Sequence, residues 1–175
     1  MPYTAAMKIL ITNDDGIQAP GIQHLAAALK GLGELIIVAP KKEQSGAGLG
    51  ITLHSTLEAC PYDFGDSITA YTVSGTPADC VKMACSVLLP SPPDIIVSGI
   101  NRGSNHGRCL LYSGTVGGVI EGAFLGVGKT RAETGDTHKE QHGMPPSHHD
   151  WGNAARRYLR RAKIALRNCL IHGVS

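Results

Sequence analysis

The sequence predicts an α/β fold in which helices connect the strands of a mostly parallel sheet. Short apolar runs rich in β-branched residues alternate along residues 8–98 with stretches whose apolar positions recur at helical spacing. Three of these runs are followed by polar, glycine-containing segments, which suit tight strand-to-helix connections. This alternation predicts parallel pairing with right-handed crossovers.

The first elements are a strand over residues 8–12, a helix that begins at Pro20, and a strand over residues 34–39 that Pro40 stops. Both strands are continuous apolar runs, which indicates burial on both faces. Proline suits the first helical position. The helix is predicted from an apolar stripe at helical spacing, formed by Ile22, Leu25, Ala26 and Leu29.

The second half of the domain repeats the alternation of strand and helix after an additional segment over residues 51–73. Residues 51–58 and 67–73 resemble strands and are expected to pair as a hairpin-like excursion. A helix over residues 77–89 is predicted from a threonine cap, a proline and an acidic residue in its first turn. A third buried strand over 94–98 and a serine-capped helix over 113–125 follow.

Residues 1–126 are therefore assigned to one α/β domain, and the character of the chain then changes. Residues 127–149 lack apolar periodicity, contain four of the eight histidines, and are interpreted as a flexible linker. Residues 150–175 are predicted to form an amphipathic helix that packs on the domain, with most of its arginines off the apolar stripe.

The composition excludes several classes of protein. The 175 residues are 42% hydrophobic and 17% charged, as in soluble globular proteins. No stretch approaches the roughly 18 apolar residues of a membrane span, and the N-terminus resembles neither a signal nor a transit peptide. The five cysteines have no paired metal spacing, so we interpret them as reduced thiols and expect a cytoplasmic protein.

The charge is distributed unevenly along the chain. Residues 1–126 contain seven basic and ten acidic residues, whereas residues 127–175 contain nine basic and four acidic residues. We interpret the basic excess as the solvated face of the last helix, and expect neither a nucleic-acid nor a membrane partner.

Polar residues follow three of the predicted strands at the point where each ends. They are residues 13–16, the loop 41–48, which contains Ser45, and residues 98–101. Because the carboxyl ends of parallel strands share one edge of the sheet, where ligands bind, we expect these segments to meet.

The two carboxylates of Asp14 and Asp15 are adjacent, and a cation would relieve their mutual repulsion. With Ser45 and Asn101 they would offer only oxygen ligands, which suit Mg²⁺, Mn²⁺ or Ca²⁺ rather than zinc. The alternative interpretation is that residues 13–16 are only a turn closed by a side-chain hydrogen bond.

A possible phosphate site begins the helix after Tyr112. Ser113, Gly114 and Thr115 offer backbone N–H groups, two hydroxyls and the positive end of a helix, although Ser113 also suits ordinary capping. A metal beside a phosphate indicates phosphoryl chemistry, in which Asp14 would be nucleophile or general base. His106 would act on the leaving group or is simply an exposed loop histidine.

At these positions the sequence resembles the SurE family, the survival-protein-E nucleotidases. Six blocks match in the family's order and cover about residues 7–126: 9–21, 38–40, 44–47, 75–81, 93–103 and 112–116.

The resemblance implies a Rossmann-like three-layer sandwich that hydrolyses nucleoside 5′- and 3′-monophosphates with one divalent cation, Mg²⁺ or Mn²⁺, with Ca²⁺ possible in a crystal. The family's metal ligands fall on Asp14, Asp15, Ser45 and Asn101. Its phosphate and substrate contacts fall on Asn13, Gly46, Ser113, Gly114 and Thr115.

After residue 126 the sequence departs from the family, which continues with a proline and another buried strand. The chain is interpreted as a truncated product without the family's C-terminal strands and dimerisation arm. A homodimer is usual in the family, but the missing arm argues against one here.

Three other hypotheses remain open. One is a non-catalytic relative that binds metal or nucleotide without turnover. A dinucleotide or nucleotide-sugar binder is disfavoured because no Gly-x-Gly-x-x-Gly follows the first strand. Nucleic-acid binding through the arginine-rich helix is the least favoured.

Overall fold

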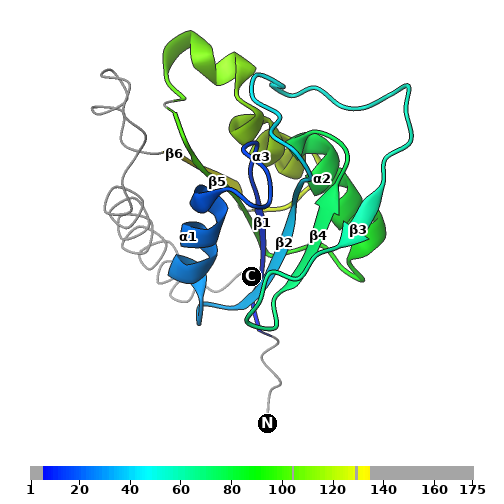
Figure 1. Cartoon of the computed structure of the whole chain (residues 1–175), viewed down its shortest axis with the longest axis vertical. Helices are drawn as coiled ribbons and strands as arrows, with labels where there is room; N and C mark the ends of the chain where they lie inside the picture. Colours follow the sequence, from blue (N-terminus) through cyan, green and yellow to red (C-terminus); the bar gives the residue numbers. More distant parts are fainter. Residues whose placement is uncertain (1–5, 104, 129, 135–175) are drawn as a thin grey trace.

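One sheet organises the chain, with strand order β3-β4-β2-β1-β5-β6. It is seen in a computed structural model, which describes residues 6–103, 105–128 and 130–134. Figure 1 shows the strands side by side, from β6 on the left to β3 on the right, with α1 on one side of the sheet and α2 and α3 on the other. The α/β fold predicted from the sequence is confirmed.

The central strand is β1 (Lys8–Thr12), which pairs in parallel with β2 (Glu34–Pro40) and β5 (Ile95–Asn101). Parallel pairing extends outward to β4 (Thr69–Val73) beside β2 and to β6 (Thr130–Thr134) beside β5. The carboxyl ends of these five strands therefore all point to the same edge of the sheet.

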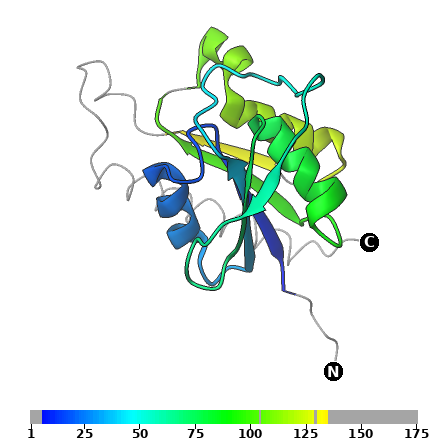
Figure 2. The same ribbon diagram turned by 45° about the vertical axis from the view of Figure 1, so that its right-hand side comes forward.

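Helices cover both faces of the sheet (Figure 2). On one face lies α1 (Pro20–Leu29), which contacts β1 and β5. On the other lie α2 (Pro77–Met83), extended by the π-helical turn η1 (Ala84–Leu88), and α3 (Gly114–Phe124), which contact each other. These three layers position the strand ends and the start of α3 at one edge.

The apolar residues of the central strands alternate between two cores. Ile9 and Ile11 of β1 face the core beneath α1, whereas Leu10 between them faces the core beneath α2 and α3. All three are at most 1% exposed. Burial of each such side chain stabilises the fold by about 1.5–3 kcal/mol, so the helices on both faces contribute to the stability of the sheet.

The first strand of the expected hairpin lies further along the chain than predicted, whereas the second lies within its predicted range. Residues 51–58 are not a strand; the short strand β3 (Ala59–Pro61) instead pairs antiparallel with β4. The backbone N–H of Thr52 donates to the carboxylate of Asp79 rather than to a strand, so a tertiary contact overrides the β-propensity of this segment.

The interpretation of residues 127–149 as a linker is wrong for its beginning. Val127 is 6% exposed, and Thr130–Thr134 form β6, so the sheet continues past residue 126. Backbone pairing with β5 defines this strand, because its sequence is polar and has no apolar alternation. The helix expected over residues 150–175 lies outside the described residues and remains a prediction.

Candidate active site

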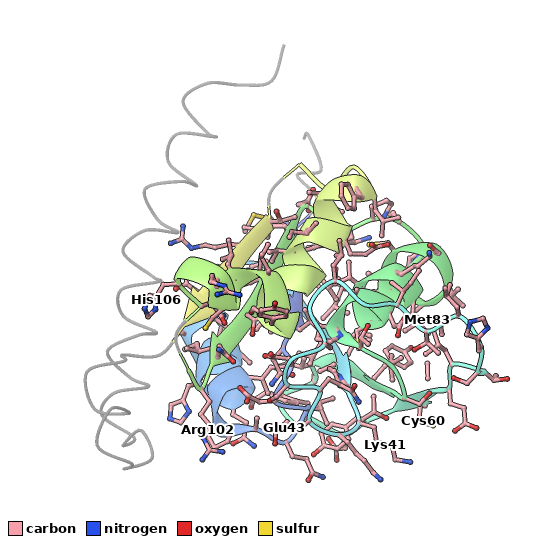
Figure 3. The ribbon with its side chains drawn as sticks, turned by 90° about the horizontal axis from the view of Figure 1, so that it is seen from above. Lys41, Glu43, Cys60, Met83, Arg102 and His106 are labelled. Atoms are coloured by element: carbon pink, nitrogen blue, oxygen red, sulfur yellow. The ribbon has the colours of Figure 1, made fainter. Side chains whose placement is uncertain are left out.

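The three predicted polar segments meet at the carboxyl edge of the sheet, together with the start of α3, but residues 98–101 form the end of β5 rather than a loop after it, because they pair with β6. Figure 3 looks onto this edge, along which Arg102 after β5 and Glu43 after β2 are labelled. The backbone N–H of Gln44 donates to the backbone oxygen of Asp14 at 2.7 Å, and that of Arg102 donates to Oδ2 of Asp15 at 3.2 Å. These two bonds join the first loop to both others.

Asp14 lies at the centre of this arrangement and is 5% exposed. The hydroxyl of Thr115 donates to its Oδ1 at 2.5 Å. A Cβ placed on Gly114 would lie 2.8 Å from the Cβ of Asp14, so only glycine allows α3 to start this close. The first turn of α3 therefore lies directly against the Asp14 side chain.

Negative charge accumulates around the two aspartates. Burial raises the pKa of Asp14, and the hydrogen bond from Thr115 opposes that rise. Burial and then the charge of Asp14 raise the pKa of Asp15 to about 6, although the backbone N–H of Arg102 lowers it. Glu43 adds a further repulsive charge to both carboxyl groups.

Ser45 and Asn101 are held by bonds within their own loops. The Ser45 hydroxyl donates to Oε1 of Glu43 at 2.5 Å. The Asn101 amide donates to the oxygen of Gly103 at 2.9 Å and to Oδ1 of Asn105 at 3.3 Å. Ser45 follows Gln44, whose backbone N–H donates to Asp14, and Asn101 precedes Arg102, whose backbone N–H donates to Asp15. The four expected ligands therefore belong to neighbouring segments.

The donor chemistry at this edge fits a hard divalent cation. Neither Asp14 nor Asp15 forms an ion pair with a described residue, and a cation would relieve their repulsion. The described residues contain no cluster of three or more His, Cys, Asp or Glu side chains that could hold a metal. A metal here would therefore require the Ser45 hydroxyl and the Asn101 amide oxygen beside the carboxylates.

The expected phosphate-binding residues divide into two groups. Ser113 caps α3 by accepting from the backbone N–H of Val116 at 3.1 Å, which is the ordinary capping role considered from the sequence. Thr115 and Gly114 contact Asp14 instead. The positive end of α3 nevertheless lies beside the acidic edge, where an anion bound next to a cation would be stabilised.

Asn13 also closes its own turn, as the alternative interpretation of residues 13–16 expected. Its amide donates to the oxygen of Gly16 at 2.8 Å, while its buried Oδ1 has no hydrogen-bond partner among the described residues. Gly46 adopts φ +77°, and a Cβ there would meet nothing within 4 Å, so the Ser45 loop leaves open space beside it.

Two charged residues of this edge carried no prediction. Glu43 influences both aspartates, and its only signal in the sequence is its place two residues before Ser45. Arg102 contributes its backbone N–H, a role that side-chain chemistry does not reveal, and its charge also lowers the pKa of Asp15. His106 is exposed and lies on the rim beyond Arg102 in Figure 3.

Comparison with known proteins identifies the same family along most of the chain. The model of the family described as survival protein SurE matches residues 9–165. The 5′-nucleotidase SurE of Alkaliphilus metalliredigens is 54% identical over 121 residues, which are 68% of this chain and 48% of that protein. The 5′-nucleotidase SurE of Protochlamydia amoebophila is 50% identical over 120 residues, 68% of this chain and 46% of that protein.

A solved structure agrees with these matches. The crystal structure of the SurE protein from Aquifex aeolicus has a TM-score of 0.70 and 31% identity, and covers 95% of this chain and 61% of that chain. The chain spans about half the length of the curated relatives that it matches. No helix among the described residues is long and apolar enough to cross a membrane.

Proposed function

Because the chain belongs to the survival protein SurE family, we propose that it is a divalent-metal-dependent phosphatase that hydrolyses nucleoside 5′-monophosphates, and 3′-monophosphates, to nucleoside and phosphate. The observation that carries this proposal is the contact between Asp14 and the first turn of α3. It brings a carboxylate at a strand end, which can hold a metal, together with the positive end of a helix, which can bind a phosphate, and this combination suits phosphoryl transfer.

Asp14, Asp15, Ser45 and Asn101 are the proposed ligands of one Mg²⁺ or Mn²⁺ ion. Such an ion, when bound, polarises a phosphoryl oxygen and lowers the pKa of a coordinated water. Burial and then the charge of Asp14 raise the pKa of Asp15, and the part due to Asp14 supports this assignment, because a bound cation would relieve that repulsion.

The side chains around the ion would bind and orient the substrate. Thr115 fixes the orientation of the Asp14 carboxylate, which acts as nucleophile or as general base toward a water. The start of α3, with Ser113 and Gly114, is the proposed phosphate-binding element, and Gly46 lines the approach from the neighbouring loop, while the buried Asn13 supports the turn that carries Asp14.

Phosphate release from adenosine monophosphate by the purified full chain tests the activity. We expect turnover with Mn²⁺, none with a chelator, and a loss of at least about 100-fold in Asp14→Asn. Asp94→Asn is the matched control, since Asp94 is exposed and accepts from the backbone N–H of Lys8 at the opposite end of β1. A folded chain that binds Mn²⁺ without turnover would identify a non-catalytic relative instead.

The proposal also includes the cellular compartment and the binding partner of the protein. The four cysteines within the described residues are free thiols, which supports a reducing compartment and hence the cytoplasm. A nucleoside monophosphate is the proposed partner, and size-exclusion chromatography of the chain measures its oligomeric state.

A further inference from the structure

Asp79, in the first turn of α2, binds a loop that is distant in sequence. Its carboxylate is 1% exposed and accepts from the Thr76 backbone N–H at 2.9 Å, which completes a capping box. It also accepts from the backbone N–H of Thr52 at 3.0 Å and from the Thr52 hydroxyl at 2.7 Å. Capping of α2 requires only the bonds with Thr76, so those with Thr52 are additional.

No described Lys, Arg or His forms an ion pair with Asp79, so its charge is stabilised by hydrogen bonds from Thr52 and Thr76 and by its place in the first turn of α2. Burial by itself would raise the pKa of Asp79, but the hydrogen bonds from Thr52 and Thr76 outweigh it and hold the pKa below its ordinary value. A buried carboxylate with three or more donors is expensive to disturb, because a lost donor leaves charge unsatisfied.

The loop that Asp79 holds is the one that carries Ser45. Thr76 reinforces the attachment, because its hydroxyl donates to the oxygen of Gly50 at 2.7 Å. In the middle of the loop the N–H of Gly48 donates to the oxygen of Tyr112 at 3.0 Å. At its other end Gln44 donates to Asp14. Residues 44–52 are thus attached to the rest of the fold at Gln44, at Gly48 and over Gly50 to Thr52. Ser45 lies between the attachments at Gln44 and Gly48.

We propose that Asp79 is a positioning residue for the metal site: it anchors the loop of residues 44–52 and thereby fixes the Ser45 hydroxyl beside Asp14 and Asp15. This inference rests on the proposed function. Asp79 fastens the loop at its Thr52 end, while Gln44 fastens the other end to Asp14, so Ser45 needs less ordering when a cation binds. Without it, ordering the loop costs part of the binding free energy.

Mn²⁺ affinity of the full chain, measured by calorimetry, tests the proposal independently of turnover. We expect Asp79→Asn to weaken Mn²⁺ binding about tenfold, because the amide presents donors where a carboxylate oxygen accepted. Amide hydrogen exchange should show faster exchange at Gly48 and Thr52 in this variant. Asp94→Asn makes the same chemical change far from the loop and should leave both measurements unchanged.

A milder pair of variants serves if Asp79→Asn does not fold. Thr52→Ala removes the hydroxyl together with the Cγ2 methyl and should weaken Mn²⁺ binding about threefold, whereas Thr52→Ser removes the methyl alone, retains the donor and should bind as the original chain does. Original affinity in folded Asp79→Asn or in Thr52→Ala would overturn the proposal. Failure of the unaltered chain to bind Mn²⁺ would instead overturn the metal site on which the proposed function depends, and this inference with it.

Discussion

The hydroxyl of Thr115, in the first turn of α3, donates to Oδ1 of Asp14 at the end of β1 at 2.5 Å. Both residues are almost completely buried. The bond joins segments 101 positions apart and opposes the rise in the pKa of Asp14 that burial causes. It therefore connects the orientation of the proposed catalytic carboxylate to its ionisation.

Thr115→Val should reduce kcat/KM for adenosine monophosphate about 10- to 100-fold, because a hydrogen bond to a charged group contributes about 1.5–3 kcal/mol. The pKa of Asp14 should also rise, which moves the acidic limb of the pH–rate profile to higher pH. Thr115→Ser keeps the donor and should keep the profile. An unshifted profile in a folded Thr115→Val chain would contradict the assigned role of this bond.

The stability of the metal-free chain should depend on pH through Asp15. Its pKa is raised to about 6 in the folded state, so its contribution to stability is fully present below its unfolded pKa of about 4 and is lost as the pH rises through about 6. Urea unfolding with a chelator between pH 4 and 7 measures this loss. Asp15→Asn should lack it, and subtracting the two curves removes the opposite contribution of Asp79.

Gly117 tests the contact between α3 and the Ser45 loop. A Cβ at Gly117 would lie 2.0 Å from the backbone oxygen of Gly48, so Gly117→Ala should destabilise the chain by about 1–3 kcal/mol. The helix propensity of alanine alone would have the opposite sign. Gly128→Ala, where the added Cβ meets nothing within 4 Å, should change the free energy of unfolding by less than about 0.5 kcal/mol.

Much of the fold follows from local pattern. The strands β1 and β2 and the helix α1 lie where their apolar spacing predicts them, because burial on the sheet determines both the pattern and the structure. The helix α3 begins at its predicted serine cap, whereas β5 extends three residues beyond its predicted end at Ser98. The convergence of Asp14 with the Ser45 loop follows from strand direction alone, since parallel strands end at one edge.

The remaining features depend on partners that are distant in sequence. The polar strand β6 exists because β5 offers it backbone hydrogen bonds, and its own side chains give no strand signal. The attachment of Thr52 to Asp79 spans 27 positions and replaces a strand that propensity favours. The repulsion between Glu43 and the aspartates likewise arises only from the folded geometry.

The three-residue strand β3 has a consequence for association. It lies at one end of the strand order, where unpaired backbone groups would otherwise invite another chain to add a strand. Its last residue is Pro61, which has no N–H to offer, and only Ala59 and Cys60 precede it. The edge strand β3 is too short and has too few backbone N–H donors to pair with a strand of another molecule.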